Sequence, residues 1–448
     1  MRADLRLAWL LTRGSDRREW WRVTLTAFGA ALATGIGLAV AVITSIDGQY
    51  SVSVGAGLLD HSRDRQGVII ALLLLLVPVL GFLGQCARVG AVHRDRRVAA
   101  LRLAGATPRQ VRRIAALEAG LACLAGSSVA TVFAVLLLLR LWQHPEPLAW
   151  LGIALVAVAV PVLGAAVSAL SLRRVVASPL GWVRRVRSTR GPGRAFLAVT
   201  VLLAVLAVCV VLTMHFGDPL PLALGPLTVF AVSLLIGVSA VWLAGWSSRR
   251  LGTALASRAR RPALLIAAER LRDDPWATAR THAAVLLVTV VGTAFAGIRL
   301  VLLHVVDHTD HLAENRSYYT TGLSLSGAAV LVALVLTLSA LAVGTAESLA
   351  TRRRGLAAQA AAGVPQSVLG RALLLETALP LAPAVLLAGA GGTAIYVGWA
   401  KLIDDPVGPV PLVPVLVPVV VYAACLLAAA TSLPLLRRSV RPAELRYV

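Results

Sequence analysis

The amino-acid sequence predicts an all-α polytopic membrane protein with ten transmembrane helices in a 4+2+4 arrangement. Hydrophobic residues make up 58% of the 448 residues and the mean hydropathy is +0.81, whereas soluble domains average roughly 45–50% apolar residues. Apolar runs of about 20 residues, long enough to cross a bilayer as a helix, recur along the chain. An internal repeat groups these helices into two four-helix units joined by two linking helices.

The apolar runs define the predicted helices in order. They cover residues 23–45, 67–87, 115–139, 149–172, 195–216, 226–246, 282–303, 325–346, 372–398 and 409–435. The first run follows a basic N-terminus but is longer than the apolar core of a signal peptide, which has about 7–15 residues. We therefore expect it to remain in the protein as the first transmembrane helix.

The formal net charge of +22 indicates membrane topology rather than nucleic-acid binding. Most basic residues lie in alternate loops and at both termini, and loops rich in arginine face the cytoplasm. Both termini are therefore expected in the cytoplasm, with anionic lipid headgroups nearby. Lys401 is the sole lysine among 43 basic residues, a bias that suggests a GC-rich bacterium and hence a bacterial cytoplasmic membrane.

Loop lengths differ on the two sides of the predicted membrane. The outer loops cover residues 46–66, 140–148, 217–225, 304–324 and 399–408. None of these reaches the roughly 50 residues of a small domain, so no extracytoplasmic domain is expected. The inner segments are longer and helical in pattern, notably residues 88–114, 247–281 and 347–371.

The internal repeat is clearest in two inner loops. Gly105 and Glu118 are thirteen positions apart, as are Gly363 and Glu376. Six further identities accompany the repeat: Arg96, Ala99, Ala100, Ala104, Arg113 and Leu117 align with Arg354, Ala357, Ala358, Ala362, Arg371 and Leu375. We therefore divide the chain into a first unit (1–185), a linking pair (186–261) and a second unit (262–448). Internal repeats of this kind are typical of transporters.

The sequence ALRLAGATPRQVRRIAALEAG at residues 100–120 and the closing Pro-x-x-Leu-Arg at 442–446 resemble the FtsX-like permease domain of MacB-type ABC transporters. The resemblance covers both four-helix units, and the ten-helix layout is also similar to BceB-like permeases. Two features depart from the family. The acidic residue often found early in the loop is Arg97 here and Gly355 in the second copy, and the large extracytoplasmic domain is missing.

The resemblance implies that the two loops carry coupling helices, at residues 94–110 and 352–368, which dock on two cytoplasmic ABC ATPase subunits. Gly105 and Gly363 are expected to end the helices in left-handed turns, and the following prolines to discourage their continuation. The expected coupling residues are Arg96, Arg97, Arg102, Gly105, Pro108, Arg109, Arg354, Gly363 and Pro365. The alternative is a pair of basic loops with interfacial helices and no partner.

The two loops differ in their basic residues. Arg102 and Arg109 in the first copy correspond to Ala360 and Ser367 in the second. This difference predicts that one ATPase subunit is held more firmly than the other.

ATP is expected on the partner and not on this chain. A phosphate-binding loop needs the pattern Gly-x-x-x-x-Gly-Lys-Ser/Thr. Lys401 lies instead beside Asp404 and Asp405 in an outer loop. We therefore expect no enzymatic activity and no bound cofactor here, with ATP and Mg²⁺ on a separate ATPase subunit.

Four charged residues near the ends of predicted helices are further candidates. Glu118 and Glu376 begin helices at the inner side, where we favour an ion pair with Arg113 or Arg371, or a snorkelling contact, over a proton relay. Arg140 and Arg299 lie near outer ends. They either extend to the headgroups or bind a phosphate or carboxylate on a substrate.

His304, His308 and His311 lie on one face if the helix continues into the outer loop, with Asp307 beside them. This spacing fits a solvated polar segment, a Zn²⁺ site or an acid sensor. We favour the solvated segment and expect no metal.

These observations predict the permease subunit of an ATP-driven ABC transporter. Short outer loops favour cargo handled within the membrane, such as antimicrobial peptides, lipids or hydrophobic antibiotics. The alternative is a mechanotransmitting module that relays ATPase strokes to a sensor kinase or cell-wall partner without transport. An ion-coupled carrier is disfavoured, because the predicted helices have few acids away from their ends.

Overall fold

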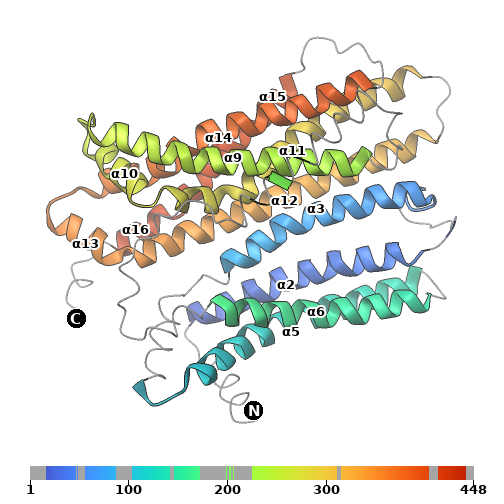
Figure 1. Ribbon diagram of the computed structural model, residues 1–448, viewed down its shortest axis with the longest axis horizontal. Coiled ribbons are helices and arrows are strands. Elements are labelled where there is room, and N and C mark those ends of the chain that lie inside the picture. The colour runs from blue at the N-terminus through green and yellow to red at the C-terminus, as the bar shows by residue number, and fades with distance from the viewer. Residues whose placement is uncertain are drawn as a thin grey trace. The chain divides into compact units, whose positions relative to one another are not determined.

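The structure is a computed structural model in which helices dominate (Figure 1). It describes residues 17–46, 48, 56–86, 103–141, 146–171, 198, 201, 202, 205, 225–309, 314–402 and 412–439. No strand occurs within these ranges. The chain divides into two compact units, Met1–Val186 and Arg187–Val448.

The first unit is built around its first helix. The helices are α2 (Arg17–Thr44), α3 (Ser62–Cys86), α5 (Pro108–Leu141) and α6 (Pro147–Ser171). Helix α2 packs against the other three, and α5 also packs against α6. Gly126 lets α5 approach α2 closely, because a Cβ atom there would lie 1.9 Å from the carbonyl oxygen of Ala27. Small residues at such contacts are typical of membrane helix packing.

The second unit has two central helices, α11 and α14. Its elements are α9 (Gly225–Ala256), α10 (Pro262–Asp273), α11 (Pro275–His308), α12 (Arg316–Thr351), α13 (Arg353–Ala361), α14 (Gln366–Leu402), α15 (Leu412–Ala430) and α16 (Leu433–Ser439). Helix α11 packs against α9, α12, α14 and α15, and α14 packs against α9, α10 and α15. A close backbone contact between the central pair is at Gly392, where a Cβ atom would lie 2.5 Å from the carbonyl oxygen of Val290.

Nine helices in the described part of the chain are long and apolar enough to cross a membrane. They are α2, α3, α5, α6, α9, α11, α12, α14 and the segment Leu412–Leu436, which includes α15. The predicted all-α polytopic fold is confirmed. The remaining predicted helix, at residues 195–216, falls almost entirely outside the described residues.

Several helices are longer than the sequence predicted. Helix α14 has 37 residues, which corresponds to about 55 Å at the usual rise per residue, whereas the hydrocarbon core is roughly 30 Å thick. The prediction followed the apolar runs and therefore stopped at the first charged residues. Because these helices continue past the apolar core, their ends project from the membrane and can carry contacts with other parts of the chain.

The two units share a register at the helix that follows each glycine turn. Helices α5 and α14 begin 258 residues apart, at Pro108 and Gln366. The predicted division at residues 185 and 261 stays a prediction. In it α9 is a linking helix, and in the structure α9 packs on α10, α11 and α14.

Candidate functional site

Gly105 and Gly363 have the same unusual backbone conformation. Their φ angles are +93° and +89°, in the left-handed region that strains side chains with a Cβ atom. Nothing lies within 4 Å of the position that a Cβ atom would take at either residue. Glycine is therefore required at both positions because of the backbone conformation, and not because space is lacking. The predicted left-handed turns are confirmed, whereas their role in coupling stays a prediction.

The turn at Gly363 has the hydrogen bonds of a Schellman C-cap. The N–H of Gly363 donates to the carbonyl of Ala360 at 2.9 Å, and the N–H of Val364 donates to the carbonyl of Gln359 at 3.1 Å. Val364 also packs against a buried cluster of leucines that includes Leu356. Within the predicted coupling segment 352–368, helix α13 thus ends at Ala361 and α14 begins after the turn, which makes a rigid corner.

The turn at Gly105 is followed by a capping box at the start of α5. The backbone N–H of Thr107 donates to Oε1 of Gln110 at 2.8 Å, and the N–H of Gln110 donates to Oγ1 of Thr107 at 3.3 Å. Pro108 is the first residue of α5, a position that suits proline because its missing N–H is not needed there. Our sequence reasoning missed this box, although the Thr-x-x-Gln signal was available.

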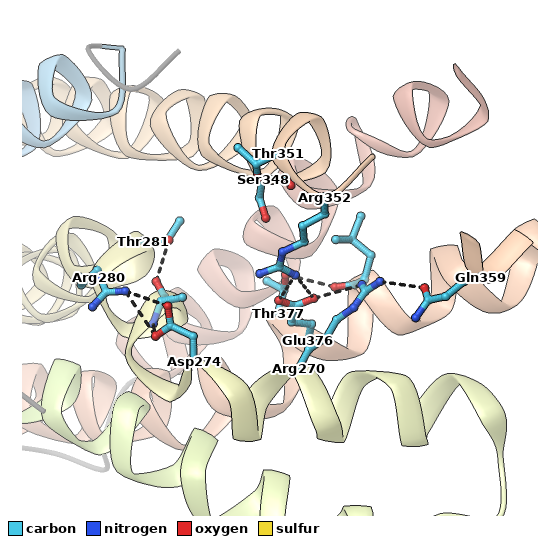
Figure 2. A network of polar contacts seen from close by, with 12 residues as sticks. Arg270, Asp274, Arg280, Thr281, Ser348, Thr351, Arg352, Gln359, Glu376 and Thr377 are labelled. Atoms are coloured by element: carbon cyan, nitrogen blue, oxygen red, sulfur yellow. Dashed lines mark hydrogen bonds and ion pairs between the residues drawn. The ribbon is translucent and has the colours of Figure 1, made fainter. Parts of the chain in front are cut away.

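Glu376 lies at the centre of a half-buried charge cluster, which we define as Arg270, Arg352, Gln359 and Glu376 (Figure 2). Nη1 of Arg352 lies 2.8 Å from Oε1 and 3.1 Å from Oε2 of Glu376. Nη1 of Arg270 lies 3.4 Å from Oε2 of Glu376, and its Nη2 donates to Oε1 of Gln359 at 3.4 Å. The cluster thus joins α10, the start and end of α13, and α14.

The cluster is shielded from water to different degrees. The side chains of Arg270 and Glu376 are 16% and 15% exposed, and that of Arg352 is 36% exposed. Burial lowers the pKa of the Arg270 guanidinium, and the nearby Glu376 carboxylate opposes this effect. Removing one partner of such a charge pair is strongly destabilising, because the other charge is left buried without compensation.

The sequence named the wrong arginine as the partner of Glu376. Arg371 is exposed, and five helical positions separate it from Glu376, which turns it about 140° away around the helix. The real partners are distant in sequence, 24 and 106 positions away. The equivalent Glu118 is buried, with 7% of its surface exposed.

Asp274 joins α10 to α11 (Figure 2). Asp274 is both the C-cap residue of α10 and the N-cap residue of α11. As the N-cap, its carboxylate accepts a hydrogen bond from the backbone N–H of Ala277 at 3.1 Å. Its backbone N–H donates to the carbonyl of Arg270 at 3.2 Å, and Arg280 pairs with its carboxylate at 3.2 Å. These contacts fix the angle between the short helix and the transmembrane helix that follows it.

The remaining candidates are spread over the described residues. Arg140 is exposed beside the last residue of α5, and Arg299 is exposed nine residues before the end of α11. The rings of His304 and His308 are tilted by 40° relative to each other, with centroids 4.1 Å apart. No group of three metal-ligand side chains is found in the part of the chain described.

Several predicted residues lie outside the described part. They are Arg96, Arg97, Arg102 and His311, together with positions 94–102 of the first predicted coupling helix. Arg109, Arg354 and Pro365 are exposed around the two turns, as are both glycines. Asp307, predicted beside the histidines, instead forms an ion pair with Arg316 at the start of α12.

Comparison with known proteins assigns the segment around the first turn to a protein family. Residues 68–178 match the family model described as FtsX-like permease C-terminal. This segment carries an FtsX-like permease domain, which supports an FtsX-like ABC permease. The matched segment runs from α3 through the Gly105 turn to α5 and α6, and the second turn lies beyond it. No curated protein matches the chain.

The family assignment carries two consequences. An FtsX-like permease is the membrane component of its transporter and associates with a cytoplasmic ABC ATPase. Together with the apolar helices, the assignment makes the chain a multi-pass protein of the cell membrane.

Proposed function

We propose that this permease subunit is of the MacB or BceB type and docks two cytoplasmic ATPase subunits on its two glycine turns. The supporting observation is that one turn recurs, with positive φ at Gly105 and Gly363 and a long helix beginning three residues later. A single copy could be a local feature of one loop. Two copies in the same register fit two equivalent binding sites in a transporter built from internal repeats.

The exposed side chains at the first turn suit a protein contact. Leu103 is 84% exposed, the largest fraction among the exposed large hydrophobic residues that the structure describes. Arg109 is exposed four residues after Gly105. Apolar side chains and arginines are common at the centres of protein interfaces. We therefore assign Leu103 and Arg109 to the ATPase contact.

The charge cluster provides a route from the second turn into the membrane. The pair between Glu376 and Arg352 ties α13 to α14, and the pair between Glu376 and Arg270 ties α14 to α10. Asp274 then joins α10 to α11. A displacement of α13 by the ATPase would therefore move the central helices α11 and α14 as a rigid body.

The proposed cargo is amphiphilic and is exported or extracted from the membrane, with antimicrobial peptides, lipids and hydrophobic antibiotics as candidates. The support is that no outer loop expected from the sequence is long enough for a domain. Both termini would lie in the cytoplasm of a bacterial cell. A mechanotransmitting module that contacts a sensor kinase or cell-wall partner would use the same turns without moving cargo.

The test uses the full chain purified together with its cytoplasmic ABC ATPase. We expect Gly105→Ala and Gly363→Ala to weaken ATPase binding or stimulation. Gly355→Ala is the matched control, because Gly355 lies in helix α13, is exposed, and also has nothing within 4 Å of its Cβ position. Coupling by the turns is contradicted if all three variants bind and stimulate the ATPase equally. Stimulation by amphiphiles distinguishes transport from signalling alone.

A further inference from the structure

The last turns of α9 and the following segment carry a basic patch. It consists of five exposed arginines: Arg249, Arg250, Arg258, Arg260 and Arg261. Within the described residues, none of the five pairs with an acidic side chain. The coupling function makes no use of this patch.

Neighbouring arginines behave differently. Arg272 pairs with Glu269 at 3.7 Å, Arg280 pairs with Asp274 at 3.2 Å, and Arg270 pairs with Glu376 at 3.4 Å. Each of these arginines thus has an acidic partner, supplied by α10, by the junction of α10 with α11, or by α14. The patch at the end of α9 has no such counter-charge among the described residues, which favours an external anion as its partner.

An aromatic stripe leads directly into the patch. Trp242 and Trp246 are 45% and 43% exposed, and Arg250 places its guanidinium carbon 5.2 Å from the ring centroid of Trp246. The spacing of four residues puts all three side chains on one face of α9, and Arg249 lies on the same face. The opposite face, with Ala244 and Ser248, is buried.

This order of side chains indicates the depth of the site in the membrane. Exposed tryptophans on transmembrane helices lie at the level of the lipid headgroups. The next turn of the same face then holds Arg249 and Arg250 at the height of the phosphates. Arginine binds phosphate through two parallel hydrogen bonds, and its contact with a tryptophan ring holds the guanidinium in place.

We propose that Trp246, Arg249 and Arg250 form a binding site for the phosphate headgroup of an anionic phospholipid. The lipid is favoured over an acidic surface of the ATPase because the tryptophans place the site at the membrane interface. Bound lipid would hold the end of α9 at a fixed depth beside α10, against which it packs.

The test is native mass spectrometry of the purified full chain titrated with phosphatidylglycerol and, separately, with phosphatidylethanolamine. We expect wild type to prefer phosphatidylglycerol, and Arg249→Gln with Arg250→Gln to weaken its binding at least about tenfold. Trp246→Leu should weaken it about threefold. Arg249→Lys with Arg250→Lys, which keeps the charge, should fall between wild type and the glutamine variant.

Arg258→Gln with Arg260→Gln is the matched control, because it removes two charges of the same patch beyond the tryptophan stripe. If this control loses as much phosphatidylglycerol affinity as the Arg249/Arg250 variant, the attraction is diffuse and the discrete site is refuted. Displacement of the lipid by inorganic phosphate at equal concentration would also refute it. The site would also be refuted if the Arg249→Gln with Arg250→Gln variant lost the co-purifying ATPase but kept its affinity for phosphatidylglycerol. The patch would then be a docking site for the ATPase.

Discussion

The two glycine turns have the same backbone but are stabilised by different means. At Gly105 the stabilising contacts lie after the turn, in the capping box of Thr107 and Gln110. At Gly363 they lie before the turn and beneath it, in the Schellman hydrogen bonds of α13 and the charge cluster around Glu376. The shared part is therefore the turn itself, and the side chains around it have diverged.

The divergence separates surface chemistry from internal support. The first turn exposes Leu103 and Arg109, whereas the equivalent positions in the second hold Ala361 and Ser367. The second turn in return rests on Glu376 and its two arginines. We infer that the first turn contributes more to ATPase affinity, whereas the second transmits movement. The substitutions below test this comparison, from the largest expected effect to the smallest.

Glu376→Gln should destabilise the second unit most, by about 2–3 kcal/mol, because it leaves Arg352 and Arg270 without their shared counter-charge. Unfolding by SDS titration in detergent micelles measures the effect. Glu269→Gln is the control, since Glu269 belongs to an exposed pair with Arg272 and should change stability by less than about 0.5 kcal/mol. If the two variants lost equal amounts of stability, the structural role of the charge cluster would be contradicted.

Gly363→Ala should cost about 1–2 kcal/mol, because it forces a residue with a Cβ atom into a left-handed conformation. Gly105→Ala should cost a similar amount, since the two φ angles are nearly equal. Gly355→Ala, inside helix α13, should instead stabilise by up to about 1 kcal/mol. The same SDS titration applies. A neutral result at Gly363 would show that the turn does not require glycine.

Thr107→Ala should cost about 1 kcal/mol by removing the capping box of α5. The equivalent position in the second copy is Pro365, so the second turn has no such box to lose. Hydrogen exchange should show faster exchange of the first α5 amides and unchanged exchange in α14. Unchanged protection at the N-terminus of α5 would mean that the box does not stabilise the helix start.

Leu103→Ala should have the smallest effect on the protein itself, because the side chain is exposed. It should lower the affinity for the ATPase about threefold to fivefold by removing apolar contact area. Surface plasmon resonance against the immobilised ATPase measures this. Ala361→Leu, the reciprocal change at the second turn, should raise the affinity or leave it unchanged. A stronger loss from Ala361→Leu than from Leu103→Ala would reverse the proposed order of the two turns.

The sequence predicted helices better than it predicted their ends and their tertiary contacts. Apolar runs located the membrane helices, and the spacing of Gly105 and Gly363 located both turns. The extension of α14 to 37 residues was missed, because an apolar run marks only the part of a helix that lies in the hydrocarbon core. It does not show how far the helix continues beyond that core. The partners of Glu376 were missed because Arg270 reaches it only through the packing of α10 against α14.

The most direct test of the account is photo-crosslinking of the assembled transporter. A photoreactive phenylalanine derivative is placed at Leu103 or Ala361, with Leu412, exposed at the start of α15, as the control position. The account predicts crosslinks to the ATPase from both Leu103 and Ala361, stronger from Leu103, and none from Leu412. Crosslinking from neither turn, or from Leu412 alone, would contradict the assignment of the glycine turns as docking points.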